Sequence, residues 1–440
     1  MKRTFQFRGQ PTRAQSTWLD NTFRLVREFY NAALQERIDA YKVSGVKVDD
    51  FSKTAKKRMR RDSASVIRFI KYQKPKSITK FDQMKSLTQV RAEHPEYAAF
   101  SVNACRGALE DLDNAFKAFF RRCKAGEKPG FPRFKSYRRL RQSLKFKCAV
   151  NWYKGKGNFG YVKAKGMPGK LRFKIHNPAF LREGVVCKTM TITRDHKGLL
   201  ISFACEIPDV IPTITDDFIG VDVGIRKFLT TDDGAEVENP RLLQGKLKEL
   251  RRRQRALSRK HVKGKRQQSG NYERARKDVV RLHAKVANSR KTFHFQTAAQ
   301  LVNKALEKNC AIKVEDLNIK GLARSMLSRQ VHDVGWGDFI SRLSNKAESA
   351  GTMVYKVAPE YTSQDCSQCG KRKGKRLSDK VHECTHCGLI LGRDHNAAIN
   401  VKNRAVVSPI GANAGGIWHC LQNVPFKDSI GCGSSVAPSP

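Results

Sequence analysis

Acidic side chains are scarce in this sequence. Among its 440 residues, Asp and Glu together number 40 whereas Lys and Arg number 86, which gives a formal net charge of +46. Such an excess of positive charge is difficult to explain without a polyanionic partner, because Lys and Arg neutralise phosphates and release their counterions. A chain of this length can form about two to four domains with at least one sizeable core.

Long apolar runs and tandem repeats are also absent. No apolar run reaches the length of about 18 residues that a membrane-spanning helix needs, and no lipidation motif is present. The polyanionic partner is therefore expected to be a nucleic acid and not an anionic membrane. Residues Met1 to Arg8 are partly basic and contain no apolar stretch of the kind that a signal peptide has, so we expect a cytoplasmic location.

Disulfides are not expected, because the cytosol is reducing. Eight of the 12 cysteines stand singly in the sequence. We interpret them as small buried apolar residues or as residues without a special role. These eight are Cys105, Cys123, Cys148, Cys187, Cys205, Cys310, Cys420 and Cys432.

The other four cysteines form two C-x2-C pairs. They are Cys366, Cys369, Cys384 and Cys387. Four thiolates in two close pairs suit a tetrahedral site, and Zn²⁺ in a structural role is its usual occupant. His382 and His386 flank the array as alternative ligands, but four thiolates leave no vacancy for them.

The first half of the chain changes from helical to strand-like patterning. A short strand is expected at Thr4–Arg8, and apolar residues recur at helical spacing from Thr12 to Cys123. The Gly- and Pro-rich stretch that starts at Gly126 ends this pattern. Ser143–Pro212 then reads as short strands, which predicts a small antiparallel β-barrel that the early strand could join.

The second half alternates buried strands with helices. After Val406 the sequence is rich in Gly, Ser and Pro, which predicts a disordered or loosely attached tail. Strands are expected near 218–225, 311–318 and 352–357, and helices near 243–257, 272–306, 336–350 and 394–404.

Three carboxylates stand where this pattern would form a site. Asp222 and Glu315 end buried strands, and Asp394 opens a helix just after the cysteine array. Sites in open α/β sheets form at the carboxyl ends of strands, so these acids can converge. Their repulsion predicts a divalent cation, and Mg²⁺ or Mn²⁺ prefers oxygen ligands. Three acids can hold two such ions for phosphodiester cleavage.

Simpler interpretations of the same residues stay open. An acid at the end of a strand is more often a turn former or a helix cap than a ligand. Asp394 can be a plain N-cap, and the neighbouring His395 suits an exposed or phosphate-contacting role better than that of a base.

Several motifs together resemble a known family. The stretches that start at Ile219 (IGVDVGIRKFLTT), Val314 (VEDLNIKGL) and Arg393 (RDHNAAIN) look like the three RuvC motifs of the transposon-encoded TnpB (OrfB-like) family. The stretch YTSQDCSQCG from Tyr361 resembles the start of that family's zinc ribbon. The similarity spans roughly residues 1 to 405, and the order of the motifs is specific.

The resemblance implies an RNA-guided DNA endonuclease, related to the ancestors of type V CRISPR effectors. By this resemblance Asp222, Glu315 and Asp394 are the metal-binding triad of one RuvC site, with two Mg²⁺ (or Mn²⁺) ions. One structural Zn²⁺ occupies the ribbon. The partners are a guide RNA from the transposon and double-stranded target DNA beside a short recognised motif, in the prokaryotic cytosol or nucleoid.

The same resemblance implies a multidomain α+β fold. It combines a helical recognition lobe, a small antiparallel wedge-like β-barrel and an RNase H-like RuvC domain of α/β type with an inserted zinc ribbon. The expected boundaries are 1–10 for the first strand of the barrel domain, 11–125 for the helical recognition domain, 126–214 for the rest of the barrel domain, 215–360 for the first part of the RuvC domain, 361–391 for the ribbon, 392–406 for the last RuvC helix and 407–440 for a disordered tail.

Basic residues are expected to grip a guide–target heteroduplex by its backbone. For any single residue of this set, a solvated surface charge is an equally good interpretation. The candidates are Arg133, Lys135, Arg138, Arg139, Arg251, Arg252, Arg253 and Arg255.

One position departs from the family pattern. Relatives often have an acid two residues before the final Asp, where this chain has Gly392. This departure is the feature that favours a guided DNA binder or repressor without cleavage, although all three acids are present. A miniature type V CRISPR effector is a further alternative.

Overall fold

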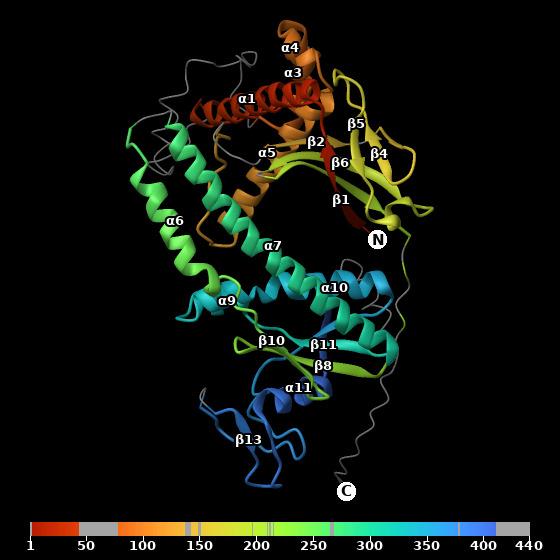
Figure 1. Ribbon diagram of the computed structural model, residues 1–440, viewed down its shortest axis with the longest axis vertical. Coiled ribbons are helices and arrows are strands. Elements are labelled where there is room, and N and C mark those ends of the chain that lie inside the picture. Colours follow the sequence, from red (N-terminus) through yellow and green to blue (C-terminus); the bar gives the residue numbers. More distant parts are fainter. Residues whose placement is uncertain are drawn as a thin grey trace, which may run out of the picture. The chain divides into compact units, whose positions relative to one another are not determined.

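A computed structural model of the chain describes residues 2–43, 78–136, 142–147, 151–195, 197–208, 210, 213, 215–264, 268–376 and 379–410. The chain divides into two compact units, Lys2–Pro208 and Asp209–Pro440 (Figure 1). None of the helices in the described ranges combines the length and apolar character that crossing a membrane requires.

The first unit contains a seven-stranded antiparallel sheet in the order β2-β6-β7-β1-β5-β4-β3. Strand β1 lies at its centre, with Phe5 opposite Phe203 of β7, so the early strand does join this sheet. Phe5 and Phe7 point into the core, where Phe7 packs against Phe173 and Phe180. The strands are β1 (Lys2–Gln10), β2 (Gln142–Lys147), β3 (Trp152–Lys154), β4 (Phe159–Val162), β5 (Leu171–Lys174), β6 (Val186–Asp195) and β7 (Gly198–Glu206).

This sheet is a half-barrel, whereas the sequence predicted a small antiparallel β-barrel. Within the described residues, β2 and β3 form two separate ends of the strand order and do not pair with each other. Helix α5 (Val102–Lys124) packs directly on β2, since a Cβ atom at Gly107 would lie 2.6 Å from the carbonyl oxygen of Lys145. A covering helix protects an end strand, so closure of the sheet is not needed there.

The remaining helices of the first unit are α1 (Arg13–Val43), α3 (Lys80–Glu93), α4 (Pro95–Ala98) and the short 3₁₀ helix η2 (Pro178–Leu181). Helix α3 begins with a capping box in which Thr79 and Asp82 satisfy each other's backbone amides. Apolar faces of α1 and α5 supply buried Phe29, Leu34 and Leu112 to the same core as the sheet.

The second unit contains a six-stranded mixed sheet in the order β10-β9-β8-β11-β12-β15. Strands β8, β11 and β12 are parallel, whereas β9, β10 and β15 pair antiparallel to their neighbours. All five residues of β11 are buried, as expected for a parallel strand covered on both faces. The strands are β8 (Phe218–Val223), β9 (Lys227–Thr231), β10 (Glu236–Glu238), β11 (Ala311–Glu315), β12 (Val354–Val357) and β15 (Val406–Ile410).

Helices cover both faces of this sheet. Helices α7 and α10 pack on one face through Leu301, Phe339 and Leu343, and α11 packs on the other (Figure 1). Strands β13 (Val381–Glu383) and β14 (Ile390–Gly392) form a separate hairpin. The helices are η3 (Gln244–Lys246), α6 (Leu247–Arg259), α7 (Gly270–Glu307), α8 (Ile319–Leu322), α9 (Ser328–Val334), α10 (Trp336–Ala350) and α11 (Arg393–Asn403).

The prediction of disorder from residue 407 onward is wrong for its first residues. Val406–Ile410 forms β15, which pairs with β12 and places Ile410 opposite Val354. The Ser344 hydroxyl donates to the carbonyl oxygen of Ile410 at 2.6 Å. Two adjacent valines at 406–407 favour a strand, and the open edge of β12 supplies its partner. The rest of the predicted tail, 411–440, lies outside the described residues.

Candidate functional site

Strands β8 and β11 bring Asp222 and Glu315 next to each other. In the parallel register Val221 lies opposite Val314, so Asp222 and Glu315 occupy the next position on the two strands. Both residues are at the carboxyl end of their strand. Since neighbours in register share a face, the two carboxylates lie on the same side of the sheet.

A glycine allows α11 to approach this side of the sheet closely. A Cβ atom at Gly220 would lie 2.1 Å from the carbonyl oxygen of Ala398 and 2.6 Å from the amide nitrogen of Lys402. Gly220 is two residues before Asp222 and therefore faces the same way. Asp394, in the first turn of α11, is thus carried to the end of the strands where Asp222 lies.

The far end of α11 is fixed as well. The buried Lys313 of β11 donates from its Nζ to the carbonyl oxygens of Lys402 and Arg404, each at 2.8 Å. A cation at a helix C-terminus satisfies free carbonyls and complements the helix dipole. Lys313 and Gly220 face each other in the strand register, so together they set the position of α11 on the sheet.

The electrostatics show that the three acids are neighbours. Burial raises the pKa of Asp222 well above its usual range, and the negative charges of Glu315 and Asp394 raise it further. Burial also raises the pKa of Glu315, while a hydrogen bond from Thr362 opposes that shift. Desolvation combined with like charges is the environment in which a bound cation stabilises carboxylates.

The acids are close without forming a tight cluster. Arg393 donates from Nε and Nη2 to Asp394 Oδ1, at 3.1 and 3.0 Å. Throughout the part of the chain that the structure describes, the four cysteines are the one group of three or more candidate ligands whose atoms all lie within 4.8 Å of one another. The Asp394 carboxylate is thus paired with the Arg393 side chain. It lies beside Asp222, with which it would bind a metal ion.

A cavity of about 460 Å³ opens beside Glu315, between the ends of β11 and β12 and helices α8 and α10. Asp316 and Lys356, paired at 2.7 Å, line it together with Ser341 and Asn345. The cavity therefore lies at the carboxyl ends of the parallel strands, where ligand sites of α/β sheets are found.

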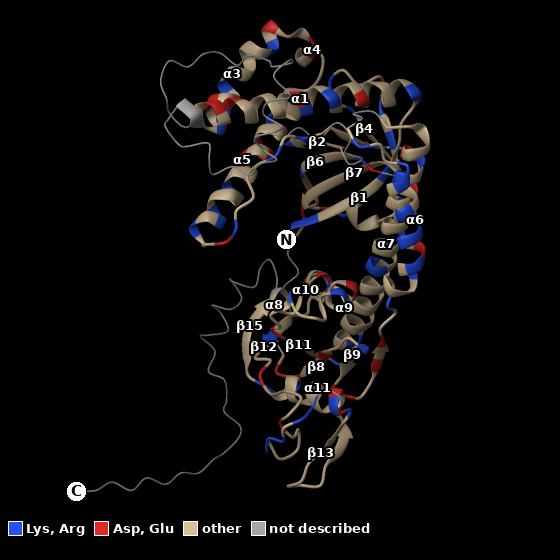
Figure 2. Cartoon of the chain, turned by 90° about the vertical axis from the view of Figure 1, so that its left-hand side faces the viewer, with Lys and Arg blue, Asp and Glu red and all other residues tan. Residues whose placement is uncertain are grey.

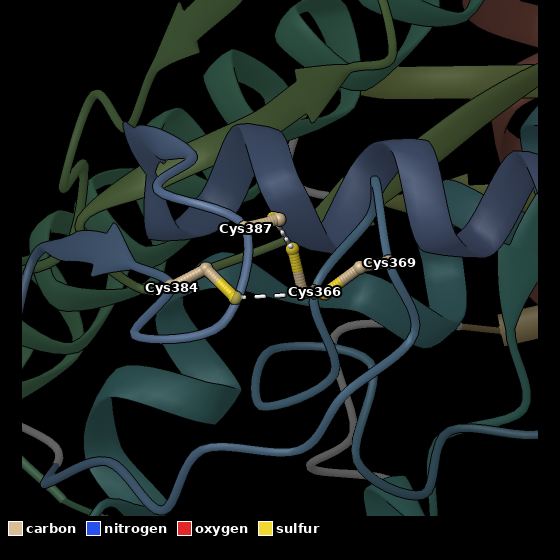
Figure 3. Close-up of side chains that lie close together, drawn as sticks. All are labelled: Cys366, Cys369, Cys384 and Cys387. Carbon is tan, nitrogen blue, oxygen red and sulfur yellow. Dashed lines mark hydrogen bonds between the residues drawn. The ribbon is translucent and has the colours of Figure 1, made fainter.

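The four cysteines of the array come together as the sequence predicted (Figure 3). The Sγ atoms of Cys366 and Cys387 are 3.6 Å apart, as are those of Cys369 and Cys384. Four sulfurs around Zn²⁺ at about 2.3 Å would form a tetrahedron with edges of about 3.8 Å. The cluster fits zinc in both ligand type and size.

Two equivalent turns shape this cluster. The amide of Cys366 donates to the carbonyl of Lys371, and the amide of Cys384 donates to the carbonyl of Leu389. Gly370 and Gly388, each following the second cysteine of its pair, adopt φ values of +71° and +78° that favour glycine. Amides of Cys387 and His386 lower the pKa of Cys384 to about 6, which favours the thiolate that a metal binds.

The chain leading into the ribbon is hydrogen-bonded to the carboxylate site. Asn396 Oδ1 accepts from the amide of Ser367 at 3.0 Å, and Asn396 Nδ2 donates to the carbonyl of Asp365 at 2.8 Å. The Thr362 hydroxyl donates to Glu315 Oε1 at 2.5 Å. The sequence analysis missed these supporting residues, although polar Asn396 in a buried position of α11 was a usable signal.

The histidines near the array have other roles. His382 is fully buried, and neither ring nitrogen has a hydrogen-bond partner among the described residues. His386 is exposed, and neither histidine belongs to the four-ligand cluster. His395 Nε2 lies 3.0 Å from the backbone carbonyl of Asp232, so it contacts the protein and is not a free surface group.

The basic candidates differ from one another in their surroundings. Lys135 lies over the ring of Tyr30 and near Asp111, and Arg253 is paired with Glu249 at 2.6 Å. Arg252 and Arg253 line a cavity of about 390 Å³ between α6 and α7, where Lys and Arg are frequent (Figure 2). Arg133, Arg251, Arg252 and Arg255 are exposed, and Arg138 and Arg139 lie outside the described residues.

Comparisons with known proteins agree with this architecture. Family models match three parts of the chain: "Helix-turn-helix domain" at residues 1–45, "Probable transposase" at 202–326 and "Cas12f1-like, TNB domain" at 336–401. The first of these covers β1 and α1. The third covers α10, β12, the cysteine array and most of α11.

Two relatives match most of the chain, and both carry the name "Putative RNA-guided DNA endonuclease". One, from Streptomyces pristinaespiralis, is 28% identical over 406 residues, which are 91% of this chain and 89% of the relative. The other, with the suffix InsQ, is from Escherichia coli (strain K12). It is 30% identical over 313 residues, which are 67% of this chain and 72% of the relative.

The fold and the cysteine cluster define the class of the protein. A chain of the solved structure described as "Cryo-EM structure of the Cas12f1-sgRNA-target DNA complex" is 14% identical and matches with a TM-score of 0.55, over 90% of this chain and 84% of that chain. The fold is a multidomain α+β fold of the Cas12f type, with a half-barrel sheet and a four-cysteine cluster suited to zinc. Within this class, the chain belongs to the transposon-encoded TnpB (OrfB-like) family.

Proposed function

We propose that this protein is an RNA-guided DNA endonuclease that cuts double-stranded DNA at one RuvC site formed by Asp222, Glu315 and Asp394. The observation that carries the proposal is that Asp222 and Glu315 occupy neighbouring positions at the carboxyl ends of β8 and β11, while the close approach of α11 to Gly220 brings Asp394 to the same end of the sheet. The raised pKa of Asp222, caused by burial and by the charges of Glu315 and Asp394, agrees with this arrangement. Relatives that cover most of the chain have names that describe the same activity.

The donor set suits Mg²⁺ or Mn²⁺. Carboxylates are the ligands that these ions prefer, and Mg²⁺ is commonly bound by one or two carboxylates together with substrate phosphates. When two such ions are bound, they activate a water molecule and stabilise the leaving oxygen of the phosphodiester. A site completed by the substrate's phosphates is consistent with acids that are neighbours without a tight cluster.

Two of the three acids have separate supports in the protein. The Thr362 hydroxyl donates to Glu315 and orients its carboxylate. The close packing of α11 on Gly220 fixes the position of the helix and therefore of Asp394 in its first turn. Arg393 holds Asp394 in the free protein and is placed to contact a phosphate once Asp394 turns to a metal. The charges of Glu315 and Asp394 both raise the pKa of Asp222, so the ionisation of Asp222 depends most on a bound cation.

The guide RNA and the DNA account for the net charge of +46. Base pairing selects the target, and the helical and half-barrel parts of residues 1–214 hold the guide and read a short motif beside the target. Residues 215–360 and 392–406 form the RuvC domain in this assignment, and 361–391 form a ribbon with one structural Zn²⁺. Arg133, Arg251, Arg252 and Arg255 are exposed and contact the nucleic-acid backbone.

The test starts with the RNA that copurifies with the protein. Programmed with that RNA, the wild-type protein is expected to cut matching double-stranded DNA in Mg²⁺. Asp222→Asn is expected to lose cutting and to keep the RNA, because the substitution removes a charge and little volume. A protein that binds no RNA, or an Asp222→Asn variant that cuts like the wild type, would overturn the proposal.

A guided binder without cleavage is the second candidate. The observation that favours it is Gly392, which precedes α11 and provides no side-chain cap or acid beside Asp394. RNA-dependent DNA binding without strand breaks in Mg²⁺ or Mn²⁺ would decide for this function. The sequence of the copurified RNA separates a transposon-derived guide from that of a miniature type V CRISPR effector, whose guide comes from a repeat array.

A further inference from the structure

Two cysteines outside the ribbon lie side by side in the first unit. Cys187 of β6 and Cys205 of β7 are direct cross-strand partners, and their Sγ atoms are 3.2 Å apart. The sequence analysis interpreted both as single cysteines that are either small buried apolar residues or residues without a special role, and Cys205 is indeed buried. Their proximity was not predicted, because it depends on the antiparallel register of the β6–β7 hairpin, which their spacing in the sequence does not reveal.

Their positions suit a disulfide without movement of the backbone. Directly opposed residues of an antiparallel pair have Cα atoms about 4.5 or 5.5 Å apart. Disulfides join Cα atoms about 4.4 to 6.8 Å apart, so either kind of opposed pair falls in that range. The irregularity of the ladder comes after Cys187, between Cys187 and Thr189, and leaves the cysteine pair in register.

The two thiols differ in access. Cys205 is buried, with 2% of its surface exposed, whereas Cys187 is only half-buried and can meet a small molecule from solution. Cys187 is therefore the thiol that a reagent reaches first. Cys205 is the buried thiol next to it.

The two thiols also differ in acidity. The hydrogen bond between the two sulfurs, in which either thiol can be the donor, lowers the pKa of Cys187, and a hydrogen bond with Trp152 lowers it too. The hydrogen bond between the two sulfurs raises the pKa of Cys205. Since the thiolate is the attacking form, Cys187 is the nucleophile of the pair.

We propose that Cys187 and Cys205 are a reversible thiol-oxidation site, which forms a disulfide with a small-molecule disulfide such as oxidised glutathione as the oxidant. The Cys187 thiolate attacks one sulfur of oxidised glutathione, which forms a mixed disulfide and releases one glutathione thiolate. The Cys205 thiol then loses its proton and attacks the Cys187 sulfur, which releases the second glutathione thiolate. The two glutathione thiolates take up the protons that the two protein thiols lose, so two thiols of the protein are oxidised and one glutathione disulfide is reduced to two glutathione thiols.

The second step is favoured by the first. Cys205 is a poor nucleophile while it donates to the Cys187 sulfur. Once Cys187 is a mixed disulfide, its negative charge is gone, and the main cause of the raised Cys205 pKa is removed. The Cys205 thiol is therefore more acidic after the first step than before it, while burial continues to raise its pKa.

Other single cysteines provide an internal comparison. Cys105 is fully buried, and burial raises its pKa to about 12. Its thiolate fraction at neutral pH is correspondingly small and reagents do not reach it, so the half-buried Cys187 is expected to react with oxidised glutathione faster than Cys105. Cys123 is exposed, so its modification by oxidised glutathione measures the reactivity of a thiol that is simply accessible to solvent.

The bond would join the open end of the β6–β7 hairpin. The connecting turn lies at Asp195–Gly198, whereas Cys187 and Cys205 are near the opposite end of the two strands. A cross-link there is expected to slow hydrogen exchange of the amides between the turn and the cysteines, because local opening of the strand pair is blocked.

The experiment treats the zinc-loaded full-length protein, with its copurified RNA, with oxidised glutathione at neutral pH. Digestion without reduction, followed by mass spectrometry, is expected to yield a Cys187–Cys205 linked peptide that dithiothreitol removes. A pair that stays reduced while Cys105 or Cys123 is modified would overturn the proposal. So would a linkage of either cysteine to a different partner as the main product.

Two variants separate the steps. Cys205→Ser is expected to stop at a glutathione adduct on Cys187, because no thiol resolves it, whereas Cys187→Ser is expected to leave Cys205 unmodified. Cys123→Ser is the matched control and should form the linked peptide like the wild type. An adduct on Cys205 in the Cys187→Ser variant would contradict the assigned order, and the wild-type mapping stands even if a variant folds poorly.

Discussion

The second unit holds two clusters of potential metal ligands that differ in how far the protein alone assembles them. The four thiols of the ribbon are already within 4.8 Å of one another, with sulfur separations close to the edges of a zinc tetrahedron. The charges of Glu315 and Asp394 raise the pKa of Asp222, but the three carboxylates do not reach that closeness, and Asp394 is paired with Arg393.

The difference follows from the chemistry of the ligands. Thiols can approach one another by S–H···S contacts, and the backbone hydrogen bonds of the two turns of the ribbon bring the four sulfurs together. The negative charges of carboxylates repel one another, which is one cause of the raised pKa of Asp222, so the protein places the three acids near one point without bringing them into contact. A preassembled site suits a structural ion that stays bound, and an open one suits ions that arrive with a phosphate substrate.

The largest effect is expected at the open cluster. Glu315→Gln should lower DNA cleavage by at least about a thousandfold, because a carboxylate at such a site contributes several kcal/mol to the stabilisation of the transition state. RNA and target binding should stay within about twofold of wild type. Single-turnover cleavage and filter binding measure the two effects separately.

A neighbouring acid is the control for this substitution. Asp316→Asn changes a carboxylate that adjoins Glu315 in sequence but is paired with Lys356 at 2.7 Å. It should leave cleavage within about tenfold of wild type. Equal losses in both variants would indicate a structural effect on the end of β11, and a fully active Glu315→Gln variant would remove Glu315 from the site.

The preassembled cluster should act on the open one through hydrogen bonds. Cys384→Ser is expected to weaken zinc binding and unfold the ribbon, since zinc binding supplies on the order of 10 kcal/mol to the folding of small zinc modules. Asn396 of α11 then loses its hydrogen bonds to Ser367 and Asp365, and Glu315 loses the hydrogen bond from Thr362. Because these bonds support the acids, cleavage should fall at least about tenfold. Zinc content, hydrogen exchange of residues 361–403 and cleavage rates test this sequence of events.

The exposed Cys123 gives the matched control, since Cys123→Ser should change neither zinc content nor cleavage. Unchanged cleavage by a Cys384→Ser protein that has lost its zinc would break the link between the two clusters. The ribbon would then be a separate module, and Gly220 and Lys313 alone would hold α11 in place.

Gly220→Ala tests the approach of α11 to the sheet. The new Cβ atom meets backbone atoms of Ala398 and Lys402, which cannot move aside as a side chain can. Overpacking of this kind costs about 1 to 3 kcal/mol of folding stability, and displacement of Asp394 should reduce cleavage as well. Denaturant unfolding and cleavage assays measure both effects.

Gly245→Ala is its control, because a Cβ atom at Gly245 meets no other atom within 4 Å. That variant should keep wild-type stability within about 0.5 kcal/mol. If Gly220→Ala is as stable and active as Gly245→Ala, the close packing of α11 on β8 is not what positions Asp394.

The sequence predicted these clusters better than it predicted their supports. Asp222 and Glu315 end apolar strands, and parallel strands of one sheet necessarily bring such ends to one side. The cysteine spacing likewise predicted a four-thiol cluster. The contact of Thr362 with Glu315 depends on how the ribbon's leading segment folds back, which no local pattern encodes.

The open form of the first sheet and the cysteine pair were missed for a related reason. Strand patterns in 143–212 predict strands but not which strands become ends, and here α5 covers β2 through Gly107. The pairing of Cys187 with Cys205 depends on a hairpin register that includes an irregularity at Cys187/Thr189. Tertiary packing decides both features.

The smallest effect is expected away from both clusters, at the basic cavity between α6 and α7. Arg252 is exposed at this cavity, and a phosphate contact there should contribute about one released counterion. Arg252→Gln should therefore make the dependence of log affinity on log salt concentration less steep by about one and leave cleavage of bound DNA unchanged. Arg342, whose Nε and Nη2 atoms both donate to Asp338 at 2.8 Å, is already neutralised within the protein. Arg342→Gln should keep the wild-type slope. If the wild type, Arg252→Gln and Arg342→Gln show the same dependence of log affinity on log salt concentration, Arg252 makes no phosphate contact and is simply solvated. The positive charge of α6 would then have no demonstrated role in binding nucleic acid.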